Sequence, residues 1–189
     1  MNWRVMLPNL FTAGNLFCGY LSIVYSLHHG RPLDAAWLIL IAACFDACDG
    51  AVARACRGSS QFGFEFDSLA DIVSFGVAPS MLIYSSVFHQ YELPGLILSS
   101  FPLMFAGLRL ARFNTKKSNG GKSFFIGLPS PAAACLIVVS FLISYFYNSG
   151  FVSARLMLVM TIAVSVLMVS QLKFQRVPFR AIRRASRRA

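Results

Sequence analysis

The chain has 189 residues, of which 57% are hydrophobic and 13% are charged, and its mean hydropathy is +0.63. A soluble domain is about half apolar and about a quarter charged, so this composition excludes an ordinary soluble protein. Seventeen Lys and Arg residues against seven Asp and Glu residues give a net charge of +10. In so apolar a chain, this charge favours contact with anionic membrane lipids over nucleic acid.

A membrane-spanning α-helix needs about 20 mainly apolar residues. Stretches of this kind recur along the chain, and polar segments rich in Gly, Pro, Asn or Ser separate them as turns. We predict an all-α integral membrane fold with six spans, at residues 10–28, 34–54, 63–88, 94–112, 129–148 and 152–172. The membrane domain then covers 1–172, and a basic tail covers 173–189.

The basic residues alternate between the connections. The first, third and fifth connections carry only Arg31, whereas the second and fourth connections and the tail hold most of the other Lys and Arg residues. Basic segments stay on the cytoplasmic side of a membrane. This pattern predicts both termini in the cytoplasm, and we expect a bacterial inner membrane.

Four of the seven acidic residues fall inside predicted spans: Asp46, Asp49, Asp67 and Asp71. An ionisable group inside a membrane helix costs at least about 2.5–3.5 kcal/mol, so it marks a functional site by default. Asp46 and Asp49 are three residues apart, and Asp67 and Asp71 are four apart, so each pair shares a helix face. A short turn between the two helices would bring the four carboxylates to one depth.

Four carboxylates at one site repel each other strongly unless cations hold them. Their oxygen atoms suit hard cations such as Mg²⁺, Mn²⁺ or Ca²⁺. Two divalent ions would neutralise the cluster and leave a charged site open to a diphosphate. Packing between membrane helices accounts for the small residues nearby, such as Gly50 and Gly63, but not for the four aspartates.

Residues 46–71 read DACDGAVARACRGSSQFGFEFDSLAD. This segment matches the signature D-x2-D-G-x2-A-R-x8-G-x3-D-x3-D of the CDP-alcohol phosphotransferases at all eight specified positions. Further segments resemble the bacterial membrane-bound phosphatidylserine synthases: PNLFTAGNLFCGY, FDSLADIVSFGVAPS, LRLARFN and GLPSPAAA. The resemblance covers nearly the whole chain except the tail.

The resemblance implies a six-helix membrane core with a polar cavity open to the cytoplasm, usually in a homodimer. It implies an enzyme that transfers the phosphatidyl group of CDP-diacylglycerol to L-serine and releases CMP. The implied cofactors are two divalent ions, Mg²⁺ or Mn²⁺, held by Asp46, Asp49, Asp67 and Asp71. Asp71 would also act as the general base, because an alcohol is a poor nucleophile without one; a plain ligand role for Asp71 stays open.

The resemblance also implies contacts to the CDP-lipid, from Asn9, Thr12, Gly50, Arg54, Ser60 and Gly63. Asn9, Thr12 and Asn15 form one polar stripe on the first span, and hydrogen bonding between helices would explain this stripe equally well. The carboxylate of serine needs a cation, and the candidate acceptor contacts are Arg109, Arg112, Lys122 and Ser130. Orientation of the chain would place the three cations on the same side in any case, and Ser130 could simply break the helix together with Pro129 and Pro131.

Two other functions remain open from the sequence. Another enzyme of the same class would use glycerol 3-phosphate, inositol phosphate or choline as the acceptor, and a phosphorylated acceptor would need more cations in the pocket. A cation transporter would also place acidic residues in membrane helices. The transporter alternative is disfavoured because the carboxylates lie in one hairpin and no inverted repeat is apparent.

Overall fold

The structure is a computed structural model, which describes residues 3–28, 31–56, 60–118, 127–147 and 152–170. Every regular element among these residues is helical. The elements are α1 (Trp3–Leu27), α2 (Pro32–Cys56), α3 (Gln61–Asp71), the π-helix η1 (Ile72–Val77), α4 (Ala78–Ser86), the 3₁₀-helix η2 (Phe88–Tyr91), α5 (Glu92–Ser99), α6 (Phe101–Ser118), α7 (Ser130–Tyr147) and α8 (Ala154–Val169). The prediction of an all-α membrane protein is confirmed.

Five segments are long and apolar enough to cross a membrane: Met6–Leu27, Pro32–Val52, Gln61–Ser86, Phe88–Thr115 and Ser130–Tyr147. The sixth predicted span corresponds to α8, which is apolar but has only 16 residues. At about 1.5 Å per residue, α8 is roughly 24 Å long, somewhat less than the thickness of the hydrocarbon core. The predicted domain boundary after residue 172 lies outside the described residues.

Two of the spans are not uniform α-helices. The third span runs through α3, the π-helix η1 and α4, and the wider turn begins directly after Asp71. Pro79 follows closely, and a proline crowds the carbonyl four residues before it, which a wider turn relieves. The fourth span breaks at Ser100, just before Pro102, which cannot donate a backbone hydrogen bond to the preceding helix.

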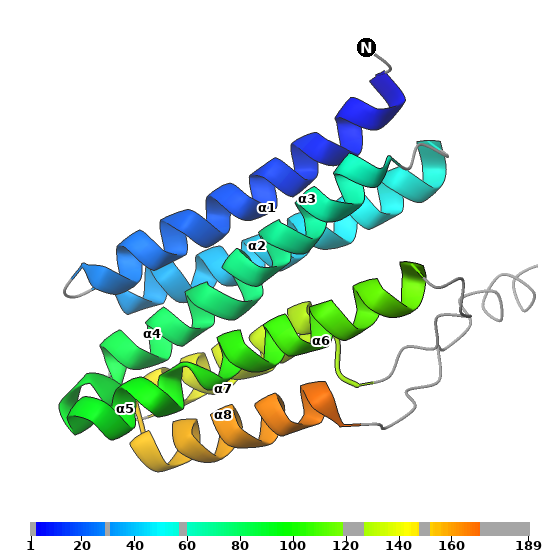
Figure 1. Cartoon of the computed structure of the whole chain (residues 1–189). Coiled ribbons are helices and arrows are strands. Elements are labelled where there is room, and N and C mark those ends of the chain that lie inside the picture. Colours follow the sequence, from blue (N-terminus) through cyan, green and yellow to red (C-terminus); the bar gives the residue numbers. More distant parts are fainter. Residues whose placement is uncertain (1–2, 29–30, 57–59, 119–126, 148–151, 171–189) are drawn as a thin grey trace, which may run out of the picture.

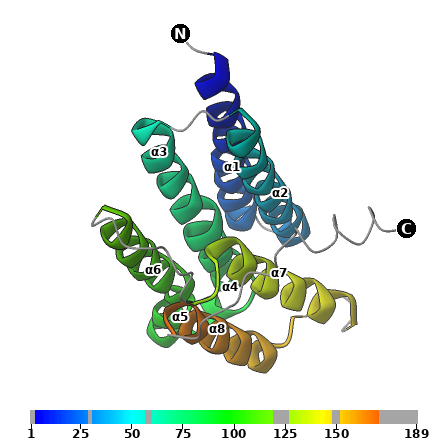
Figure 2. The ribbon, with the colours of Figure 1, turned by 90° about the vertical axis from the view of Figure 1, so that its right-hand side faces the viewer.

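The third span is the central helix of the bundle. It contacts α1 on one side and α6 and α7 on the other, and Figures 1 and 2 show it between these helices. Phe75 and Leu82 of this span are buried with Phe141 and Met157 in the common core. The position of Asp67 and Asp71 is therefore fixed by a span that packs against α1 on one side and against α6 and α7 on the other.

The contact between α1 and η1 is unusually close. The Ser74 hydroxyl donates a 3.0 Å hydrogen bond to the carbonyl oxygen of Asn15, and Gly19 lies against the backbone of Ser74. A Cβ atom at position 19 would be 2.8 Å from the Ser74 Cα, so only glycine permits this approach. Close packing through small residues is the usual way in which membrane helices associate.

The helix ends at one end of the bundle surround the polar site. Figure 1 shows that α1, α3 and α7 begin there and that α2, α6 and α8 end there. The connections predicted to be basic therefore join helices at one end, as an alternating six-span chain requires.

Candidate active site

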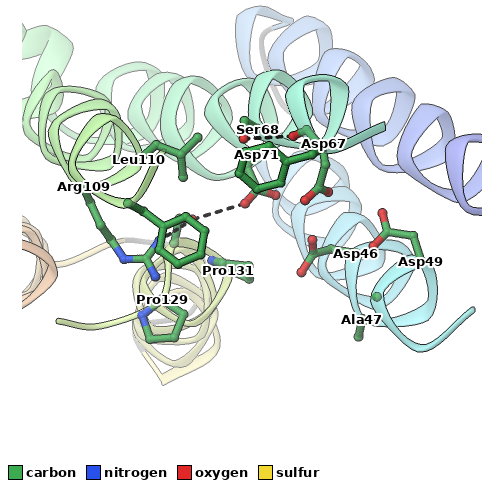
Figure 3. Close-up of a pocket in the computed structure, with 14 residues that line it drawn as sticks. Asp46, Ala47, Asp49, Asp67, Ser68, Asp71, Arg109, Leu110, Pro129 and Pro131 are labelled. Atoms are coloured by element: carbon green, nitrogen blue, oxygen red, sulfur yellow. Dashed lines mark hydrogen bonds between the residues drawn. The ribbon is translucent and has the colours of Figure 1, made fainter. Parts of the chain in front are cut away.

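Three carboxylates from two helices converge near this end of the bundle. Asp46 and Asp49 lie on α2 and Asp67 lies on α3, and one oxygen atom from each side chain lies within 4.8 Å of the others. Figure 3 shows the two pairs of aspartates facing each other across the gap between these helices. The predicted antiparallel placement of the two carboxylate pairs is present in the structure.

Asp71 lies one helical turn beyond Asp67, on the side of the cluster toward α6 and α7. Its carboxylate interacts electrostatically with the other three aspartates and with Arg109 of α6. Its Oδ2 atom accepts a 3.4 Å hydrogen bond from the Ser130 hydroxyl, whereas its buried Oδ1 atom has no hydrogen-bond partner. Asp71 thus joins the acidic cluster to a second polar group formed by Ser130 and Arg109.

The helix α1 supports the cluster from the other side. The Thr12 hydroxyl is buried and lies 3.0 Å from the Asp49 Oδ2 atom and 3.1 Å from the Pro8 carbonyl oxygen. A neutral hydroxyl that binds a carboxylate orients it without adding charge. The structure therefore places Thr12 as a partner of Asp49, and the predicted contact to the nucleotide stays a prediction.

The residues at the start of α3 have structural partners of their own. Ser60 is the N-cap of this helix, and its hydroxyl accepts a 3.0 Å hydrogen bond from the Gly63 backbone N–H. A Cβ atom at Gly63 would lie 2.8 Å from Asn9 Oδ1, so glycine allows α1 to approach α3 here. Asn9, Ser60 and Gly63 border the cluster without lining the cavity beside it.

A cavity of about 450 Å³ opens beside the four aspartates. Its described lining comes from α2, α3, α6 and the start of α7: Asp46, Ala47, Asp49, Gly50, Phe64, Asp67, Ser68, Asp71, Arg109, Leu110, Phe113, Pro129, Ser130 and Pro131. Figure 3 shows Arg109 across the cavity from the acidic cluster. The cavity is therefore acidic at one end and carries an arginine at the other.

The predicted acceptor contacts separate into two groups. Arg109 and Ser130 line the cavity, and the Arg109 Nη1 atom donates a 3.3 Å hydrogen bond to the Ser130 hydroxyl oxygen. Arg112 is exposed on α6 and does not line the cavity. Lys122 lies outside the described residues, as does the side chain of Arg54.

The structure adds residues that the sequence reasoning did not select. Ser68 lines the cavity, and the Asn114 amide lies 3.5 Å from its hydroxyl oxygen. Phe64 and Phe113 form a tilted aromatic pair on the same wall, with ring centroids 6.5 Å apart. Ser68 directly follows Asp67, and Asn114 ends the segment LRLARFN, so proximity to known motifs was the signal available for both.

The residues present fit divalent cations. Three carboxylate oxygens within 4.8 Å of one another repel strongly without a cation, and oxygen atoms are the ligands that Mg²⁺ and Mn²⁺ prefer. The Asp71 Oδ1 atom adds a buried oxygen without a hydrogen-bond partner next to this group. These features support the acidic cluster as a candidate metal centre.

Comparison with known proteins identifies the class. Residues 5–171 match the CDP-alcohol phosphatidyltransferase family. The chain is similar to a CDP-diacylglycerol–serine O-phosphatidyltransferase of Helicobacter pylori, with 39% identity over 92% of this chain and 73% of the relative. A protein of the same description from Bacillus subtilis is 38% identical over 89% of both chains, and an archaetidylserine synthase of Methanothermobacter thermautotrophicus is 41% identical over 92% of this chain and 71% of that protein.

The fold has a solved counterpart. The crystal structure of the Mycobacterium tuberculosis phosphatidylinositol phosphate synthase with CDP-DAG bound superposes with a TM-score of 0.65 at 19% identity, over 86% of this chain and 80% of that chain. The chain belongs to the CDP-alcohol phosphatidyltransferase family. It is a membrane-embedded phosphatidyltransferase, and relatives at about 40% identity are described as CDP-diacylglycerol–serine O-phosphatidyltransferases. It therefore belongs among enzymes and not among cation transporters.

Proposed function

We propose that this enzyme transfers the phosphatidyl group of CDP-diacylglycerol to the hydroxyl group of L-serine. The serine oxygen forms a bond to the phosphorus that carries diacylglycerol, the bond from this phosphorus to the CMP oxygen breaks, and CMP leaves. The names of relatives that match about nine-tenths of the chain support this acceptor. The solved relative with the same fold carries CDP-DAG, which supports the donor.

The charge of the cavity lining is the observation that favours serine over a phosphorylated acceptor. Among its described lining residues, Arg109 is the one cation; it lies opposite Asp46, Asp49 and Asp67, with Asp71 between. One guanidinium matches the single carboxylate of an amino acid, whereas a phosphorylated acceptor with two charges calls for more cations. Arg109 is therefore proposed to bind the serine carboxylate, and Arg112 and Lys122 remain the further predicted acceptor contacts.

The aspartates are proposed to have two roles, metal binding and proton acceptance. Asp46, Asp49, Asp67 and Asp71 would hold two divalent ions, Mg²⁺ or Mn²⁺, which when bound supply neutralisation of the phosphate charge. Asp71 would also accept the proton of the serine hydroxyl, because its Oδ1 atom lacks a hydrogen-bond partner and Asp71 lies between the cluster and Arg109. Gly50 and Arg54 would contact the CDP-lipid together with Asn9, Thr12, Ser60 and Gly63.

An acceptor competition tests this assignment. Purified enzyme with CDP-diacylglycerol and Mn²⁺ is expected to release CMP with L-serine, and at least about tenfold more slowly with glycerol 3-phosphate, inositol phosphate or choline. The expected ratio follows from the loss of roughly 1.4 kcal/mol when a charged or polar group lacks its partner. Faster CMP release with a phosphorylated acceptor would show that serine is not the natural substrate.

We also propose that both termini face the cytoplasm, in a bacterial inner membrane and in a homodimer. Single cysteines introduced at 117 and 185, in a variant without the five native cysteines, should react with an impermeant reagent from the cytoplasmic side only. A cysteine in place of His89, in the third connection, provides the control for the other side. Reaction of position 117 or 185 from outside would contradict the orientation.

A further inference from the structure

We propose that Ser130 is a positioning residue. Its hydroxyl keeps the Asp71 carboxylate and the Arg109 guanidinium at a fixed separation and orientation and prevents them from pairing directly. This inference rests on the proposed function, in which Asp71 accepts the proton of the acceptor and Arg109 binds its carboxylate. It differs from the role predicted from the sequence, where Ser130 is a direct contact of the acceptor or part of a helix break.

The hydrogen-bond directions around Ser130 follow from chemistry. Arginine carries only donors and an ionised carboxylate carries only acceptors. The Ser130 hydroxyl oxygen therefore accepts from Arg109 Nη1 at 3.3 Å, and its proton is donated to Asp71 Oδ2 at 3.4 Å. Both distances are long, as is common for active-site hydrogen bonds before the substrate binds. The hydroxyl is thereby occupied on both sides.

This arrangement leaves the Asp71 carboxylate and the Arg109 guanidinium free to interact with the acceptor. No ion pair within 4.0 Å joins Arg109 to Asp71, although the two groups attract each other. A direct pair between a guanidinium and a carboxylate is frequently bidentate and would occupy both carboxylate oxygens. With Ser130 between them, the Asp71 Oδ1 atom and the Arg109 Nε atom remain buried without hydrogen-bond partners.

The backbone fixes the place of Ser130. The residue is fully buried at the first position of α7, between Pro129 and Pro131, whose ring geometry restricts the local chain. Just before it, the Leu128 backbone N–H donates a 3.2 Å hydrogen bond to the Leu167 carbonyl near the end of α8. Gly127 has φ of +88° and lies against the Met168 carbonyl, where a side chain would not fit. The hydroxyl is thus anchored to α8 through the main chain.

The proposal predicts a specific kinetic effect. Replacing Ser130 with Ala lets Arg109 approach Asp71, so turnover at saturating serine should fall by about 10–10²-fold, the usual effect of small misplacement of reacting groups. The KM for serine should rise only together with this fall in turnover, because the arginine that approaches Asp71 is also the group proposed to bind serine. Ser130→Thr keeps the hydroxyl and should recover most of the lost turnover.

The experiment measures kcat and the KM for serine together with two binding constants, for Mn²⁺ and for CDP-diacylglycerol. Ser140→Ala is the matched control, because the Ser140 hydroxyl on the same helix donates only to the Leu136 carbonyl of its own helix. Mn²⁺ and CDP-diacylglycerol affinities are expected to stay within about twofold of wild type in both variants. Ser130→Cys, with nearly the same size and a weak donor, replaces the alanine variant if the latter does not fold.

The possible outcomes separate the inference from the function on which it rests. A higher KM with unchanged kcat would make Ser130 an acceptor contact and overturn the inference. Parallel loss of thermal stability and of both affinities, without rescue by Thr, would overturn it in favour of a structural role. Wild-type kinetics in Ser130→Ala would also overturn it. If the wild-type enzyme rejects serine but uses another alcohol, the proposed function fails, and the same comparison of variants is made with that alcohol.

Discussion

Replacing Asp46 or Asp67 with Asn is expected to abolish both Mn²⁺ binding and phosphatidyl transfer. These carboxylates come from α2 and α3, and with Asp49 they bring oxygen atoms within 4.8 Å of one another. An amide keeps one oxygen atom but removes the charge that balances a divalent cation. Charge stabilisation of this kind contributes several kcal/mol, so turnover should fall by at least about 10³-fold. Turnover is measured as CMP release, and Mn²⁺ binding by titration of the purified protein.

A matched control is available on the same helix. Asp34 is exposed near the start of α2, at the opposite end from the cluster, where it forms a 3.2 Å ion pair with Arg31. Exposed ion pairs contribute little to stability, so Asp34→Asn should retain wild-type Mn²⁺ binding and turnover. Full activity of the wild-type enzyme in excess chelator would contradict the metal-dependent mechanism.

Asp71→Asn is expected to separate proton transfer from binding of the donor lipid. If Asp71 chiefly accepts the proton of serine, CDP-diacylglycerol should still bind with a modest loss of affinity. Transfer should fall by roughly 10²–10⁴-fold, the usual contribution of a positioned base. The unpaired Oδ1 atom and the adjacent Arg109 motivate this expectation. The measurement pairs CDP-diacylglycerol affinity with turnover on the same variant at saturating Mn²⁺.

The opposite outcome also has a clear meaning. Parallel collapse of lipid affinity and turnover in Asp71→Asn would assign Asp71 to the metal site alone and leave the base unidentified. Glu65→Gln serves as the control, because Glu65 is an exposed carboxylate on α3 close to Asp67. This control should keep wild-type lipid binding and turnover.

The sequence predicted the helices and the acidic cluster because both depend on local patterns. Apolar length decides which segments span a membrane, and intervals of three and four residues decide which aspartates share a helix face. A turn of a few residues between α2 and α3 left little freedom in how the four carboxylates could meet. The fixed spacing of the family signature over residues 46–71 added the class of chemistry.

Contacts between segments that are distant in the sequence could not be predicted from local patterns. The hydrogen bond from Thr12 to Asp49 joins α1 to α2, and the contact from Ser130 to Asp71 joins residues 59 positions apart. Such pairs depend on how the helices rotate and cross, which local spacing does not determine. The break at Ser100 was missed because α5 and α6 read as one apolar run, although Pro102 is a local signal for it.

The π-helix η1 helps to set the direction in which Asp67 and Asp71 point. A single wide turn over Ile72–Val77 accommodates one more residue than an α-helix would. If this segment became a regular α-helix and kept all its residues, everything before it would rotate by about 100° relative to α4. Since α4 is held in the core, Asp67 and Asp71 would turn away from α2 while the composition of the site stayed intact. The orientation of the two aspartates therefore depends on the wide turn being kept, and not on the residues of the site alone.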